Sequence, residues 1–143
     1  MTDVLLDLNV ILDVFFSRDP WLNDSATVFE ANRAGKITAH VSAISLPTIF
    51  YLVRRNSDIS QARKVVAECL DSFQIIPVDR GTLELAQSLP GSDFEDNVQI
   101  ASAILARVES IITRDVAGFS SSPLPAMTPA QAIARFAGNS GSG

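Results

Sequence analysis

The sequence lacks several features that are typical of secreted and membrane proteins. Its single cysteine, Cys69, excludes a disulfide within the chain of 143 residues. No apolar run approaches the roughly 20 residues that a membrane helix needs. The first residues, MTD, lack the basic region of a secretory signal. We therefore expect a cytoplasmic protein with no membrane partner.

Positive charge is also scarce. The 11 lysines and arginines stand against 16 acidic residues, which gives a net charge of −5. Most proteins that bind nucleic acids are basic, so this balance argues against such a partner. It does not exclude a metal-dependent nuclease, because metal ions offset the carboxylates of such an enzyme locally and a few arginines can hold the phosphate backbone.

Short apolar runs typical of strands alternate with segments of helical spacing. We expect strands at residues 4–6, 37–41, 73–78, 111–113 and 124–127, and helices at about 10–15, 23–34, 44–55, 59–70, 82–88, 93–108 and 129–137. Such alternation predicts an α/β fold with a mostly parallel sheet covered on both faces. The chain is long enough for one domain, residues 1–137, and the final GNSGSG predicts a flexible tail over 138–143.

Acidic residues follow two of the expected strands. Asp7 comes after the first strand and Asp115 after the fourth, while Asp96 lies in the first turn of the helix between them. In a parallel sheet ligands bind beyond the carboxyl ends of the strands, so these carboxylates are expected to meet. Like charges held together need a compensating cation, and oxygen ligands suit Mg²⁺ or Mn²⁺. The pattern favours metal-assisted hydrolysis.

Each acid also has a structural explanation. A single Asp after a strand usually belongs to a turn or caps a helix. Asp93 would cap its helix, with Asp96 as the favourable first-turn acid and Glu95 as a solvated neighbour. The only histidine, His40, and the cysteine Cys69 are expected to be structural residues.

Five segments match motifs of one family, in the same order along the chain. They are VLLDLNVILD at 4–13, VSAISL at 41–46, DFEDNVQIASA at 93–103, IITRD at 111–115 and LPAMTP at 124–129. The first is similar to the opening motif D-x-N followed by apolar residues and a second Asp. Together they resemble the PIN domain family, with bacterial VapC-like ribonucleases, the toxins of toxin–antitoxin pairs, as the nearest members in appearance.

The resemblance implies a three-layer α/β/α sandwich and a Mg²⁺- or Mn²⁺-dependent endoribonuclease. It further implies RNA as the substrate, a homodimer and an antitoxin protein as a partner. By motif position, the catalytic residues and metal ligands would be Asp7, Asp96 and Asp115, with Asp93 as an additional ligand. Asn9 would orient Asp7 or a metal-bound water, and Thr113 would place its hydroxyl on a ligand carboxylate or on a water.

Two positions depart from the family pattern. The helix after the second strand usually carries a Glu, and here that position is Thr48. An Asp that is common near the last strand is replaced by Gly118, before Phe119. Loss of a carboxylate should weaken metal binding. The alternative function is therefore a catalytically weak or inactive PIN domain that binds RNA or a protein.

Cationic side chains for RNA binding are few. The candidates are Arg18, Arg54, Arg55 and Arg114, and the alternative for them is a solvated cation near a helix end.

A haloacid-dehalogenase-type phosphatase would also begin with a strand and an Asp. That class needs a second Asp as the general acid where this chain has Asn9. The only lysines, Lys36 and Lys64, do not lie at a later strand end, so this class is rejected.

Overall fold

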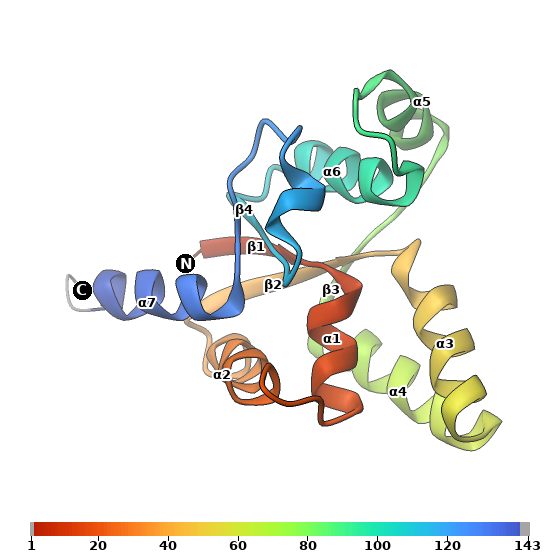
Figure 1. Ribbon diagram of the computed structural model, residues 1–143, viewed down its shortest axis with the longest axis vertical. Helices are drawn as coiled ribbons and strands as arrows, with labels where there is room; N and C mark the ends of the chain where they lie inside the picture. The colour runs from red at the N-terminus through yellow and green to blue at the C-terminus, as the bar shows by residue number, and fades with distance from the viewer. Residues whose placement is uncertain (1, 141–143) are drawn as a thin grey trace.

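A five-stranded sheet between two layers of helices forms the structure, a computed structural model that describes residues 2–140 (Figure 1). The strands are β1 (Thr2–Leu6), β2 (Ile37–Ser42), β3 (Gln74–Ile76), β4 (Ser110–Ile112) and β5 (Ala126–Met127). All neighbouring strands are parallel, in the order β3-β2-β1-β4-β5. The sheet is therefore wholly parallel, and its first strand is central.

Helices cover both faces of this sheet (Figure 1). One layer contains α1 (Leu8–Phe15), α2 (Leu22–Arg33), α3 (Ser45–Asn56), α4 (Ile59–Ser72) and α7 (Pro129–Ser140). The other contains α5 (Arg80–Ser88), α6 (Phe94–Ala106) and the short 3₁₀ helix η1 (Val116–Phe119). The expected three-layer α/β/α sandwich is confirmed. None of the helices within residues 2–140 is long and apolar enough to cross a membrane.

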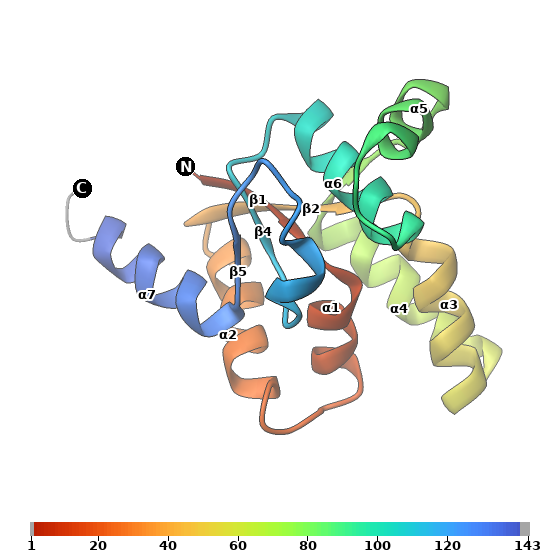
Figure 2. The same ribbon diagram turned by 45° about the horizontal axis from the view of Figure 1, so that its top comes forward.

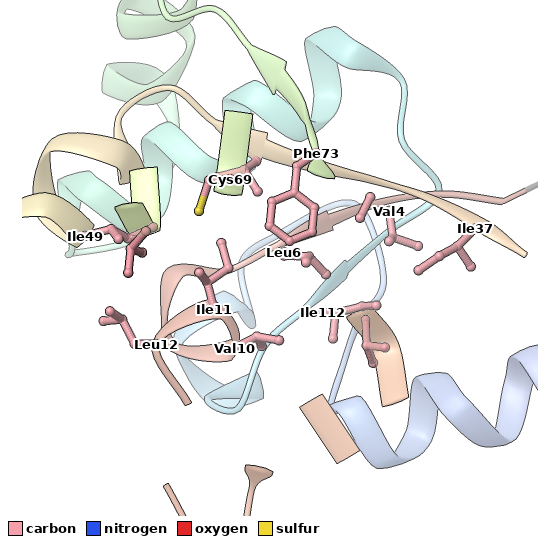
Figure 3. Packing of buried hydrophobic residues seen from close by; sticks show 14 of the residues in the cluster. Val4, Leu6, Val10, Ile11, Leu12, Ile37, Ile49, Cys69, Phe73 and Ile112 are labelled. Atoms are coloured by element: carbon pink, nitrogen blue, oxygen red, sulfur yellow. The ribbon is translucent and has the colours of Figure 1, made fainter. Parts of the chain in front are cut away.

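The central strand supplies both cores, because successive side chains of a strand point to opposite faces. Val4 and Leu6 pack in the larger cluster, with Ile112 and Phe73 (Figure 3). Leu5 belongs to the smaller cluster, on the face that α6 covers. Burial of each of these side chains contributes roughly 2 kcal/mol. This is why residues 4–6 form a continuous apolar run.

Some element ends differ from the predicted ones for local reasons. The third strand was expected at 73–78 and is limited to Gln74–Ile76, since Pro77 has no N–H to donate to a neighbouring strand. Helix α5 starts earlier than predicted, because Asp79 and Thr82 form a capping box. Helix α7 continues to Ser140, and so extends past the predicted domain end at 137 into the predicted tail. Residues 141–143 of that predicted tail lie outside the described part of the chain.

The two residues expected to be structural have such a role. Cys69 is buried in the larger core, and burial raises the pKa of its thiol to about 12. His40 lies on β2, and its Nε2 is 3.0 Å from Asp3 Oδ1 on the neighbouring strand.

Candidate metal centre

Asp7 lies at the junction between β1 and α1. Its backbone N–H donates to Ile112 O at 2.9 Å, which ties it to the end of β4. Its side-chain Oδ1 accepts from the Leu8 N–H at 2.7 Å and thereby caps α1. Figure 2 shows the start of α1 beside the loop that leads from β4 to η1. The residue is only 5% exposed, so its carboxylate is largely removed from bulk solvent.

Two buried side chains hold the Asp7 carboxylate. Gln99 Nε2 donates to Oδ1 at 2.7 Å, and Thr113 Oγ1 donates to Oδ2 at 2.8 Å. Burial raises the pKa of Asp7, and these hydrogen bonds oppose the rise because they favour the charged form. Sequence reasoning assigned no role to Gln99. The sequence offered a signal, since Gln99 lies directly before the mostly apolar stretch 100–106 of α6, where a buried Gln would require a polar partner.

Thr113 connects Asp7 to Asp115. Its hydroxyl donates to Asp7 and accepts the backbone N–H of Asp115 at 3.0 Å. The Asp115 Oδ1 accepts from Gly118 N–H at 3.3 Å and caps η1. The structure therefore shows the contact expected of Thr113 with one of the acids.

Asp96 brings a third carboxylate to this place from the first turn of α6. Its pKa is raised to about 6, by partial burial and then by the negative charges of Asp93, Asp7, Asp115 and Glu95. The backbone geometry agrees. A Cβ on Gly118 would lie 2.7 Å from Asp115 Oδ2 and 3.3 Å from Asp96 Oδ2. Both carboxylates thus reach the same glycine, and Asp7 lies close enough to affect Asp96.

The two other acids of this segment differ in role. Asp93 is exposed, and its Oδ1 accepts the Asp96 N–H at 2.9 Å as the N-cap of α6. Glu95 was expected to be a solvated neighbour, and it is in fact partly buried. One of its carboxylate oxygens, Oε1, is buried and makes no hydrogen bond within the described residues.

These oxygens suit a hydrated divalent cation. Within residues 2–140, no three or more His, Cys, Asp or Glu side chains form a ready-made metal cage. Mg²⁺ does not require one, since it keeps several waters and binds through one or two carboxylates together with substrate phosphates. Asp96 Oδ2 and Asp115 Oδ2 both lie beside Gly118, which has no side chain to crowd them. The donor set therefore fits an open site for Mg²⁺ or Mn²⁺.

Other candidate residues have different partners. The Asn9 Oδ1 accepts the Arg114 N–H at 3.3 Å, because α1 presents it to the loop after β4. The expected role of Asn9 in orienting Asp7 or a metal-bound water stays a prediction. Arg114 and Arg18 contact the buried carboxylate of Asp13. The remaining candidates lie on α3, where Thr48 is half-buried near the start and Arg54 and Arg55 are exposed in the last turn.

Comparison with known proteins agrees with this geometry. A family model for the PIN domain matches residues 3–117. The chain belongs to the PIN domain family. Among curated proteins, none matches this PIN domain significantly.

Solved structures share the fold of this PIN domain. FitAcB from Neisseria gonorrhoeae has a TM-score of 0.68 at 18% identity, over 88% of this chain and 97% of that chain. A toxin–antitoxin complex from Klebsiella pneumoniae gives 0.66 at 22% identity, over 88% and 97%. VapC20 from Mycobacterium tuberculosis, a toxin that cleaves the sarcin–ricin loop, gives 0.62 at 13% identity, over 76% and 86%. At these identities the likeness establishes the fold.

Proposed function

We propose that this PIN domain is a metal-dependent endoribonuclease that hydrolyses RNA phosphodiester bonds. The observation that carries the proposal is the crowding of carboxylates around Asp96, whose pKa rises to about 6. Uncompensated negative charge costs stability, and a bound cation or phosphate–cation pair would offset that cost.

A bound Mg²⁺ or Mn²⁺ would activate a water and stabilise charge on the scissile phosphate. Asp96 and Asp115 are the residues that would hold it, because their oxygens meet at Gly118. Asp7 would add a carboxylate whose direction is fixed by Gln99 and Thr113. Helices α1 and α6 both begin at this place, and helix N-termini favour anions such as the substrate phosphates.

The biological role we propose is that of a VapC-like toxin. Its partner would be an antitoxin protein and its assembly a homodimer, acting in the cytoplasm. Support comes from the toxin–antitoxin complex from Klebsiella pneumoniae, which has the same fold.

A second candidate is a PIN domain that binds RNA or a protein without cutting. The neutral Thr48 favours it, as does the lack of a preformed cage of three or more ligands among the described side chains. The two candidates differ in their response to metal. A nuclease gains thermal stability when Mn²⁺ is added, and it cleaves RNA. A binding domain binds RNA without cleaving it and gains no thermal stability from Mn²⁺.

Asp7→Asn is the variant that tests the nuclease. Asn caps a helix as well as Asp does, accepts from Leu8 and Gln99 through Oδ1, and can donate to Thr113 through Nδ2. The fold should therefore persist, as circular dichroism would show, while Mn²⁺-dependent cleavage of a labelled RNA is lost. Equal cleavage by the wild type and the variant would reject this assignment.

A further inference from the structure

Asp13 is a fully buried acid outside the carboxylate cluster. It lies on α1, is 0% exposed, and contacts two arginines. Arg114 Nε lies 2.8 Å from Oδ2, and Arg18 Nη1 lies 3.6 Å from Oδ1. Burying charges costs several kcal/mol per ion before pairing, so a buried ion pair is poor evidence for stability alone. A role in positioning neighbouring residues explains this buried ion pair better than a role in stability does.

Arg114 is held on three sides. Its backbone N–H donates to Asn9 Oδ1 at 3.3 Å, and its guanidinium contacts Asp13. The guanidinium carbon also lies 3.9 Å from the centre of the Trp21 ring. Asn9 and Asp13 are four residues apart on α1, so they share one face of that helix. Helix α1 therefore contacts both the backbone and the side chain of Arg114.

These contacts with α1 hold the residue that precedes a candidate metal ligand. Asp115 follows Arg114 directly, is exposed, and is held otherwise by Thr113 and by the amide of Gly118. Asp7 is the N-cap of the same helix α1. Thus a single rigid element carries one acid of the cluster at its start and fixes the neighbour of another acid from its side.

We propose that Asp13 is a positioning residue that acts through Arg114 to hold Asp115 at its place in the carboxylate cluster. This inference rests on the proposed metal centre. It implies that the Arg114 side chain contacts other residues of the protein and does not bind RNA. For Arg114 to bind a phosphate, its guanidinium would have to leave Asp13 and Trp21, and the buried acid would lose its closest partner.

Arg114→Gln separates positioning from simple electrostatics. It removes a positive charge near the carboxylates, so electrostatics alone predicts tighter Mn²⁺ binding, and a role in RNA contact predicts no change without RNA. Positioning predicts weaker binding, by about tenfold, which is the usual size for loss of a residue that orients a ligand. Mn²⁺ affinity would be measured by calorimetry in the absence of RNA. Arg33→Gln, in a surface pair with Glu30, is the matched control and should bind as the wild type does.

Asp13→Asn should weaken Mn²⁺ binding in the same direction. Since it leaves Arg114 and Arg18 without their acid, it could fail to fold, so the double variant Asp13→Asn/Arg114→Gln is made as well. If Asp13 acts only through Arg114, the double variant binds Mn²⁺ no more weakly than Arg114→Gln does. Additive losses, or Mn²⁺ affinity in Arg114→Gln equal to or tighter than in the wild type, would overturn the proposal.

Hydrogen exchange keeps this test independent of the proposed nuclease. In metal-free protein, the Asp115 amide should exchange faster in Arg114→Gln than in the wild type, because its hydrogen bond to Thr113 opens more often. Unchanged exchange would refute the positioning role. Failure of the wild type to bind Mn²⁺, with the faster exchange observed, would refute the metal centre and leave the positioning of Asp115 established.

Discussion

Asp96→Asn should stabilise this PIN domain while removing its response to metal. In the metal-free protein Asp96 is partly buried and surrounded by other carboxylates, which is why its pKa rises to about 6. Asn has the same shape without the charge. The substitution therefore relieves repulsion and at the same time removes a ligand that a cation would need.

The size of the effect follows from the pKa. A rise from 3.8 to about 6 corresponds to roughly 3 kcal/mol against the charged form. Solvent screens a partly exposed carboxylate, so about half of this applies. Asp96 also lies in the first turn of α6, where loss of an acid costs about 0.5 kcal/mol. The net gain of about 1 kcal/mol should raise the Tm by about 3 °C in a domain of this size.

The gain should depend on pH. The pKa of Asp96 is higher in the folded state than in the unfolded chain, so the folded protein binds this proton more tightly. The penalty on the wild type is present at pH 7, decreases as the pH falls through about 6, and is absent below 3.8. Thermal unfolding of both proteins without metal, at pH 7.5 and pH 4.5, should show the difference in Tm shrinking at the lower pH.

Asp24→Asn provides the matched control. Asp24 is an exposed first-turn acid of α2, and its loss should lower the Tm slightly at both pH values. With Mn²⁺ added, the wild type should gain more stability than Asp96→Asn does. A lower Tm for metal-free Asp96→Asn at pH 7.5, or a difference that does not change with pH, would refute the crowding of carboxylates.

Two further substitutions test the same centre. Gly118→Ala should weaken Mn²⁺ binding, because the added Cβ would lie 2.7 Å from Asp115 Oδ2. The control Gly81→Ala, whose Cβ would have its nearest contact at 3.5 Å, should leave Mn²⁺ binding unchanged. Equal Mn²⁺ affinities of the two variants in a calorimetric titration would count against the convergence of carboxylates at Gly118. Thr48→Glu should strengthen Mn²⁺ binding, because it restores a carboxylate in the first turn of α3; unchanged or weaker binding would show that Thr48 does not face the centre.

The fold was predictable because its signals are local. Apolar runs mark the strands, and polar residues with Gly or Pro mark their ends, so the alternation of elements leads directly to a parallel sheet. Asp7 and Asp115 could be placed at one edge by this topology alone. The length of the third strand depended instead on the missing N–H of Pro77, which concerns pairing and not hydrophobic pattern.

The roles of individual side chains were less predictable because they depend on partners far away in sequence. Arg18 and Arg114 were candidates for phosphate contact, and periodicity did not indicate that both also contact Asp13. The contact between Asn9 and the Arg114 N–H joins residues that are 105 positions apart in the chain. Gln99 was part of a motif but acquired a role only through its contact with Asp7. Such pairs are fixed by tertiary packing, which periodicity does not report.

The position of β1 has a consequence for synthesis of the protein. Strand β1 precedes the other described strands in the chain and lies between β2 and β4, and Asp7 accepts a hydrogen bond from Thr113, 106 residues later. A product truncated within α6 lacks β4, Thr113 and Asp115, and its central strand keeps one unpaired edge. A chain proposed to cut RNA would therefore complete its centre only after β4 and Asp115 have been made.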